Sequence, residues 1–441
     1  MHGGMGWPHP TTPASVVSSA ESLTAKLCFS ALIFAAYLGF SPVLTGDYGA
    51  DGALSGGGDS LRQVSFTALF LLIAAATASG KGAKALLDVP LALVAVLLWC
   101  WLSVTWAIEP GVALRRVLFT TIVTLGVTYS LNMLSYRTAM SILFTWFAVI
   151  LLLDWLAIPL LPQAVHQPGE IDKALVGNWR GVHSHKNEAG AFCALAALVF
   201  IDKAWRGRSH IIAPALAALS LAFLVMTSSK TSGGLVLVAA MAGVVFDLGY
   251  RNPTLRAVAL GTIVCGLLVA VIAFGDQAPE LLAAFEDPSS LTGRVQIWPV
   301  LLSYAADHPF LGAGYGSFWA IGDASPVYES GAKWLTTISH AHNGYLDLLV
   351  QTGLVGLALA VFGLVVRPMR RLASQPLDPE ASRWLLGSML AFCWLHDLLE
   401  TSLFDRANIV WVAMLVAFNL LERHAPQRWG GAPCPATGPG R

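Results

Sequence analysis

The feature that most constrains the fold of this chain is a succession of long apolar runs separated by short polar segments. A helix needs about 20 mostly apolar residues to cross the hydrocarbon of a bilayer. The sequence predicts an all-α polytopic membrane protein with about twelve transmembrane helices, of which 211–226 and 384–399 are short. The twelve runs are 27–44, 63–79, 87–106, 114–130, 139–161, 188–204, 211–226, 232–249, 256–275, 344–366, 384–399 and 407–422.

Composition agrees with this class of protein. Charged side chains make up 12% of the 441 residues, about half the 25% typical of soluble domains, and the mean hydropathy is +0.65. The net charge of +0 argues against a nucleic-acid partner, since such proteins carry a basic surface. Six cysteines without a C-x-x-C motif argue against a disulfide scaffold or a thiolate metal centre. The expected surrounding is the lipid bilayer.

The positions of Lys and Arg predict the orientation, because cytoplasmic loops carry an excess of both. With the N-terminus inside, 16 of the 26 Lys and Arg residues fall on the cytoplasmic side and 10 outside. We therefore expect a cytoplasmic tail at 1–26, spans one to nine within 27–275, a periplasmic loop at 276–343, spans ten to twelve within 344–422, and a cytoplasmic tail at 423–441.

The outer cations are the more informative set, because several lie directly beside apolar runs. Arg115 and Arg116 begin the fourth run, and Lys230 lies in the turn TSSKTSGG. Together they indicate an anionic ligand on the outer face, although a few outer cations are ordinary. The Lys230 turn could bind phosphate or sugar, or simply join two helices.

A second polar segment, GNWRGVHSHKNEAG, precedes the sixth span and contains Arg180, His185 and Lys186. The third is 276–343, which is long enough to be functional. In it Val295, Trp298, Leu301, Leu302 and Ala305 have helical spacing, which predicts an amphipathic helix at the outer interface. Gly312, Gly314 and Gly316 alternate with other residues, and we interpret them as a structural turn.

His342 lies about where the tenth span begins. Free N–H groups and the helix dipole at that point favour a bound anion, and a neutral imidazole there could take a proton near a phosphate. A histidine that merely caps the helix is the alternative. A metal site is another, because His183-Ser-His185 and His340-Ala-His342 both have the H-x-H spacing.

Four ionisable residues that fall toward the outer halves of the spans are functional candidates. Pairing with Arg115, Arg116 or Arg406 would equally explain them. The four are Asp154, His396, Asp397 and Glu400.

The segment from about 175 to 365 resembles the superfamily of O-antigen ligases and of O-antigen and exopolysaccharide polymerases. His342 and Asn343 are followed by nine residues and then by Gly353-Leu-Val-Gly356, as in the ligase pattern His-(Asn/Ser/Gln)-x9-Gly-x-x-(Gly/Thr/Tyr). LTGRVQIW, HPFLGAGYGSFW, AHNGYLDLLVQTGLVG and GVHSHKNEAG further resemble the exopolysaccharide polymerases.

The resemblance implies a GT-C-like membrane glycosyltransferase that uses an undecaprenyl diphosphate-linked glycan and needs no cofactor or metal. It implies His342 as the catalytic base and Arg294 and Arg180 as the arginines that hold the diphosphate, with His340 as a second candidate base. Further substrate-binding residues would be His340, Asn343, Lys186, His185, Lys230, Arg115 and Arg116.

The expected function is that of an inverting O-antigen ligase in lipopolysaccharide biosynthesis, in which lipid A–core is the acceptor. The expected location is the bacterial inner membrane, with the active site facing the periplasm. A polymerase of O-antigen or exopolysaccharide repeat units, with a glycan acceptor, is the first alternative. A lipid or solute transporter is an alternative of another class.

Overall fold

The protein is an all-α polytopic membrane protein. The computed structural model describes residues 21–45, 60–170, 173–207, 209–258, 294–328 and 338–424, together with Gly261 and Cys265. Its α-helices are α1 (Leu23–Tyr37), α2 (Pro42–Thr45), α3 (Ser60–Lys81), α4 (Leu91–Ser103), α5 (Pro110–Asn132), α6 (Tyr136–Leu160), α7 (Lys186–Trp205), α8 (Ile212–Met226), α9 (Lys230–Arg251), α12 (Arg294–Asp307), α13 (Gly344–Ala360), α14 (Arg367–Ser374), α15 (Arg383–His396) and α16 (Ile409–His424).

Each predicted span contains a helix in its described part. Among the described residues, five helical stretches are long and apolar enough to cross a membrane, namely α3, α5, α6, α9 and the continuous stretch Gly344–Ser374. Leu23–Tyr37, Leu91–Trp106 and Ile212–Met226 are shorter apolar helices. Most of the predicted span 256–275 lies outside the described residues, so the number twelve stays a prediction.

The predicted C-terminal boundary of the first span is wrong. The sequence predicts a helix to residue 44, but α1 ends at Tyr37, where the N–H groups of Leu38 and Gly39 both donate to the carbonyl of Phe34. A separate short helix, α2, then begins at Pro42. Proline has no N–H to donate and suits the first turn of a helix, so the apolar run is divided there.

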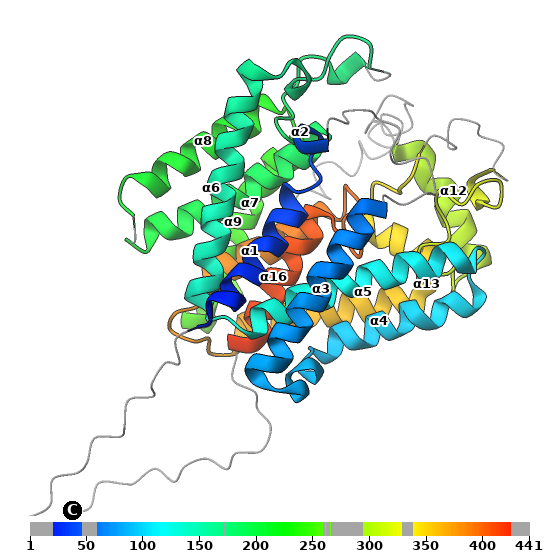
Figure 1. Ribbon diagram of the computed structural model, residues 1–441, viewed down its shortest axis with the longest axis horizontal. Coiled ribbons are helices and arrows are strands. Elements are labelled where there is room, and N and C mark those ends of the chain that lie inside the picture. The colour runs from blue at the N-terminus through cyan, green and yellow to red at the C-terminus, as the bar shows by residue number, and fades with distance from the viewer. Residues whose placement is uncertain are drawn as a thin grey trace, which may run out of the picture.

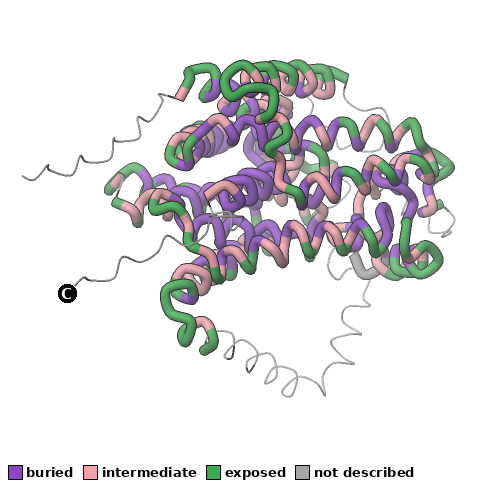
Figure 2. The backbone as a smooth tube through the Cα atoms, turned by 90° about the horizontal axis from the view of Figure 1, so that it is seen from below, coloured by how far each residue is buried: buried purple, intermediate pink, exposed green. Residues whose placement is uncertain are grey.

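The helices form two groups, and α1 and α16 lie between them (Figure 1). Helices α3, α4, α5 and α13 lie on one side, and α6, α7, α8 and α9 lie on the other. Between them, α16 packs against α1, α5, α7 and α15, and α15 packs against α9. Figure 2 shows buried residues concentrated along the inner helices, with exposed residues toward the outside. The large apolar residues that remain exposed, such as Leu71 and Leu72 on α3, suit contact with lipid.

The contacts between loops in the described part of the chain fall into two sets. One set connects loops that are predicted to be cytoplasmic, and the other connects loops that are predicted to lie outside. The first set of contacts is Lys81 and Arg423 to the carbonyl of Asn132, Arg137 to Glu380, and Arg256 to the carbonyl of Ala373. The second is Ile108 N–H to the carbonyl of Ala313, Arg116 to the carbonyl of Gly316, and Asn187 to Glu400. The grouping is the one that an alternating topology requires.

A break in α13 fixes the outer loop to the helix. Gly353 has φ +67° and ψ −176°, which is non-helical, and a side chain there would overlap the carbonyl group of Phe310. The backbone of residues 309–313 fills the break, since Leu354 N–H donates to Pro309 (2.7 Å) and Ala313 N–H donates to Val350 (2.9 Å). Only glycine adopts this conformation at so close an approach without strain.

The three alternating glycines form turns, as expected. Gly312, Gly314 and Gly316 all have positive φ, between +64° and +87°. At Gly314 a Cβ atom would lie 2.5 Å from the Cα atom of Ala107, so the turn sits directly on the segment between α4 and α5.

The predicted interfacial helix exists as α12, but its apolar face is covered by protein. Ile297, Leu301 and Ala305 are buried against Phe318, Trp319, Ala341, Leu346 and Val350, whereas Leu302 is 55% exposed. Whether the exposed part of α12, which includes Leu302, lies in the membrane interface stays a prediction. The covering residues come from the glycine-rich turn and α13, which α12 packs against.

Candidate functional site

His342 lies immediately before α13, as predicted. Asn343 is the N-cap of this helix, and its Oδ1 accepts from the N–H of Leu346 (2.9 Å). His342 itself has φ +49°, in the left-handed region that residues other than glycine seldom adopt. Such strain persists only where the surroundings impose it, and it is common at functional sites.

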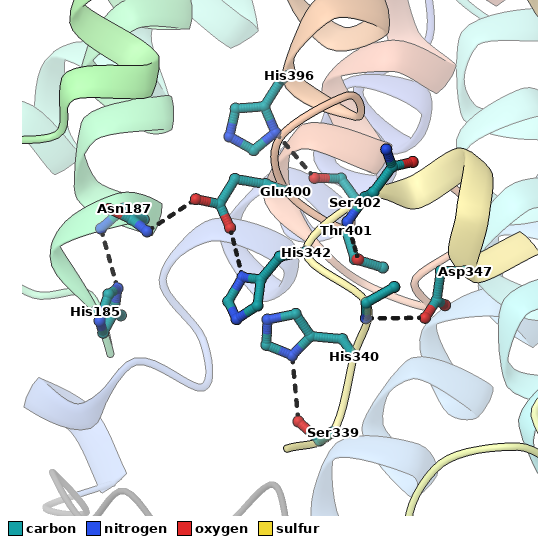
Figure 3. Close-up of polar contacts among 12 residues, drawn as sticks. His185, Asn187, Ser339, His340, His342, Asp347, His396, Glu400, Thr401 and Ser402 are labelled. Carbon is teal, nitrogen blue, oxygen red and sulfur yellow. Dashed lines mark hydrogen bonds and ion pairs between the residues drawn. The ribbon is translucent and has the colours of Figure 1, made fainter. Parts of the chain in front are cut away.

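Glu400 holds the ring of His342. Its Oε2 lies 3.2 Å from Nδ1 of His342, and its Oε1 accepts from Nδ2 of Asn187 at 2.9 Å (Figure 3). The Glu400 side chain is 10% exposed and that of His342 is 25% exposed. A carboxylate on Nδ1 favours the tautomer with its proton there, which leaves Nε2 to accept a proton.

The turn after α15 is built to present Glu400. The N–H of Gly344 donates to the carbonyls of Asp397 and Glu400, and that of Asn343 donates to Oγ1 of Thr401 (3.2 Å). On the turn itself, Oδ1 of Asp397 accepts from the N–H groups of Ser402 and Leu403.

The start of α13 is therefore not a free anion site. The N–H groups of Gly344 and Leu346 already donate to protein oxygens. The side chain of Asn343 caps the helix and also donates to the carbonyl of Leu398 (3.1 Å). Its geometry is that of a positioning residue, and its role in substrate binding stays a prediction.

His340 lies beside His342. The two histidine rings have centroids 4.2 Å apart, and Nδ1 of His340 lies 3.3 Å from Oγ of Ser339. Burial, and next the neighbouring His342, lower the pKa of His340 to about 4, so His340 is neutral at pH 7. A neutral second imidazole adds hydrogen-bonding capacity to the site without adding charge.

His185 reaches the same site from α7, of which it is the N-cap. Its Nδ1 accepts from the N–H of Asn187 at 3.2 Å. Burial lowers the pKa of His185 to about 4, with a smaller contribution from His166. The neighbouring Lys186 begins α7 and donates its backbone N–H to Nε2 of His166 (3.2 Å).

Arg180 is buried and bonded within its own loop. Its Nε donates to the carbonyl of Gln163 (2.7 Å), one Nη donates to that of Ser184 (3.2 Å), and Glu170 lies 3.7 Å away. These contacts shape the segment that carries His185. Whether Arg180 also reaches a diphosphate stays a prediction.

The two arginines of α5 differ in their surroundings. Arg116 donates to the carbonyls of Gly316, Trp319 and Ala320 at 2.6 to 3.2 Å, so it anchors the glycine-rich turn. Its neighbour Arg115 is partly exposed on the same turn of the helix. The expectation that these arginines pair with the acids of the spans is wrong for Arg116, which bonds to backbone carbonyls.

The acids named in the sequence have other partners. Asp154 pairs with His183 (3.4 Å) and accepts from the N–H of Val182. His183 is thus buried against Asp154. Burial alone would lower the pKa of His183, but the Asp154 carboxylate raises it, and the net shift is upward. The two histidines of the H-x-H motif at 183 and 185 therefore lie in different surroundings.

Among the described residues, only His340, His342 and Glu400 form a group of potential metal ligands, with their ligand atoms within 4.8 Å of one another.

Arg294 is the first residue of α12, one turn before Trp298. The indole N–H of Trp298 donates to the carbonyl of Ala341 (3.0 Å), between the two histidines. Residues four apart lie on one face of a helix, so Arg294 lies on the face of α12 that carries Trp298. Its side chain lies outside the described part of the structure.

Lys230 begins α9 at the end of an apolar groove. The groove has a volume of about 320 Å³. A side chain on Gly190, one turn along α7 from Asn187, would meet Ser229, so the groove end lies near the site. The groove is lined by Leu221, Leu224, Val225, Val236 and Leu237, with Ser228 and Ser229 beside Lys230.

A family model matches the part of the chain that contains His342, and a known protein matches about half of the chain. Residues 215–361 match a family model described as O-antigen ligase. A stretch of 219 residues is 28% identical to the exopolysaccharide production protein ExoQ of Rhizobium meliloti (strain 1021), and it covers 46% of this chain and 49% of that protein. The matches support the O-antigen ligase and polymerase superfamily. The chain thus spans about half the length of the curated relative that it matches.

This similarity is to proteins of the O-antigen ligase and polymerase type. The residues matched to the family include α9, α12 and His342, but neither Asn187 nor Glu400. The sequence named Glu400 only as one of the ionisable candidates of the spans, and it gave Asn187 no role. Their only signal was an ionisable or amide group at the predicted outer end of a span.

Proposed function

We propose that the protein is an inverting glycosyltransferase that moves a glycan from undecaprenyl diphosphate to an acceptor hydroxyl. The observation that carries this proposal is the Asn187–Glu400–His342 chain of hydrogen bonds at the outer end of α13. A base whose ring is oriented by a buried carboxylate is the arrangement that activates a hydroxyl nucleophile.

In the proposed reaction the acceptor hydroxyl attacks the anomeric carbon and gives its proton to Nε2 of His342. The bond from that carbon to the diphosphate oxygen breaks, and the diphosphate leaves with the electron pair. A diphosphate is stable as an anion, so it needs charge stabilisation rather than a proton. Lys230 and Arg294 are the proposed cations, because arginine and lysine both bind phosphate. Attack opposite to the leaving group inverts the anomeric carbon.

The apolar groove beside Lys230 supports a lipid-linked donor. Its leucine and valine side chains suit a polyprenyl chain, while Lys230 and two serines lie at one end. This separation of apolar and cationic surface matches an amphiphile with an anionic head. We propose that the site faces the periplasm of the bacterial inner membrane, where the outer loops would lie under the predicted orientation.

We propose a glycan as the acceptor, so that the protein joins repeat units of a polysaccharide. The similarity to an exopolysaccharide production protein supports this choice over lipid A–core. A ligase that transfers O-antigen to lipid A–core is the second candidate, which the His342–Gly356 pattern and the family description favour.

The test uses purified protein in nanodiscs, with an undecaprenyl diphosphate-linked repeat unit as the only sugar source. A product ladder that grows from the donor alone is expected, and a single new band that requires lipid A–core would identify a ligase instead. His342→Ala should lower the rate by about 10²- to 10⁴-fold, since a general base contributes that much. Near-normal turnover of a folded His342→Ala protein would remove His342 as the base.

A further inference from the structure

We propose that His340, His342 and Glu400 bind one Zn²⁺ ion, and that the bound ion switches the transferase off. The three residues offer ligand atoms that all lie within 4.8 Å of one another. Two imidazoles and one carboxylate are a ligand set that zinc uses where a coordination position stays open.

The spacing of two of these groups fits a shared ion. Nδ1 of His342 and Oε2 of Glu400 are 3.2 Å apart. Two ligands with bonds of about 2.0–2.1 Å to a tetrahedral zinc lie about 3.3 Å apart. These two atoms therefore already have the separation that a shared zinc ion requires, and a turn of the imidazole that aims Nδ1 at the ion completes the pair.

His340 completes the site by a rotation of its side chain. Its ring packs edge-on against that of His342, with centroids 4.2 Å apart. The ligand atom of His340 lies at most 4.8 Å from those of His342 and Glu400, whereas ligands of one tetrahedral zinc lie about 3.3 Å apart. The ligand atom must therefore move by at most about 1.5 Å.

The groups behind these ligands are those that metal sites use. Nδ1 of His340 lies 3.3 Å from Oγ of Ser339, which leaves Nε2 for the ion. Oε1 of Glu400 accepts from Asn187, so the carboxylate is held while Oε2 binds (Figure 3). Hydrogen bonds of this kind to the second atom of a ligand orient the ligand and strengthen metal binding.

Zinc on this site would remove the base, a consequence that rests on the proposed function. An ion on Nδ1 of His342 leaves the ring proton on Nε2, and an ion on Nε2 occupies that atom directly. In either case Nε2 cannot accept the proton of the acceptor hydroxyl. No step of the proposed reaction uses a metal, so in this proposal zinc acts as a reversible inhibitor.

The binding test uses metal-free, full-length protein in nanodiscs, without a histidine tag, titrated with Co²⁺ and then Zn²⁺. We expect one Co²⁺ per chain with the visible absorption of a low-symmetry nitrogen and oxygen site, and displacement by Zn²⁺. His340→Gln and Glu400→Gln should each weaken binding by at least about tenfold. His308→Gln, at an exposed position just after the end of α12, is the matched control and should bind as the unaltered protein does. Absence of binding, or equal binding by all variants, would overturn the site.

The inhibition test adds Zn²⁺ to the transfer assay and then removes it with EDTA. We expect the rate to fall as the site fills and to return on chelation. Zinc binding without loss of rate would overturn the inhibitory role. A protein that shows no transfer in any condition would contradict the proposed function, and the Co²⁺ titration would still decide whether the zinc site exists.

Discussion

At the scale of single residues, the site depends on a carboxylate that holds a histidine ring in one orientation. Glu400 has two oxygens with separate tasks, one toward His342 and one toward Asn187. The strained backbone of His342 shows that the surrounding contacts, rather than local preference, place this side chain.

We expect Glu400→Gln to lower kcat by about 10²-fold or more with little change in KM. The neutral amide can keep the packing but does not favour the required tautomer of the ring, and loss of such an orienting carboxylate costs up to about 10⁴-fold in rate. The measurement is steady-state transfer by the purified variant. Glu188→Gln is the control, because Glu188 bonds to Ser184 rather than to His342. Equal activity in both variants would mean that Glu400 does not orient the base.

At the scale of elements, the broken helix α13 and the glycine-rich turn act as one unit. The turn is fastened on one side by the break at Gly353 and on the other by Arg116. Asp347 and Gln351 of α13 add to this, since they bond to Trp319 and to the N–H of Gly316.

We expect Gly353→Ala to destabilise the protein by about 2–6 kcal/mol. Overpacking costs about 1–3 kcal/mol and a residue held at positive φ costs about 1–3 kcal/mol. The measurement is the thermal unfolding midpoint in nanodiscs. Gly234→Ala is the control, since Gly234 lies inside α9 with open space at its Cβ position, and it should be neutral or about 1 kcal/mol more stable. Similar midpoints for both variants would contradict the role of the break.

We expect the variants Arg116→Lys and Arg115→Lys to differ in stability. Arg116→Lys loses a guanidinium that reaches three carbonyls, so the unfolding midpoint should fall together with the rate. Arg115→Lys should keep the midpoint, and a raised KM there would support the predicted contact with substrate. A drop in rate without a drop in midpoint for Arg116→Lys would point to a direct role in binding.

The elements were predictable and the contacts between them were not. Apolar runs identify the spans locally, and the spacing after His342 marks the start of α13. Glu400 is 58 positions from His342 and 213 from Asn187, and Arg116 is 200 positions from Gly316. Such contacts follow from how the helices pack, and no local pattern of residues records them.

At the scale of the whole molecule, the structure separates two sets of loops. His342, Glu400 and Asn187 lie at the end with Arg116, while Lys81, Arg137 and Arg423 lie at the opposite end. A reaction confined to one end suits a substrate that is presented on one face of a membrane.

We expect labelling of single cysteines in intact cells to place the site outside the cytoplasm. Ser339→Cys should react with a membrane-impermeant maleimide once the outer envelope is permeable. Ser374→Cys, at the end of α14, should react only after the inner membrane is lysed. Both variants would be made in a chain without its natural cysteines. The reverse pattern would contradict the predicted orientation and the periplasmic site.

The break at Gly353 has a consequence for how the sequence pattern around it is used. His342 and Gly353 belong to the same pattern, yet one supplies a ring nitrogen and the other supplies room for the backbone of Phe310. A related chain that kept Gly353 and lost His342 would keep the packing of α13 on the outer loop but lose the side chain to which we assign the proton transfer. The glycines of the pattern therefore report on the fold, and the histidine alone reports on the proposed chemistry.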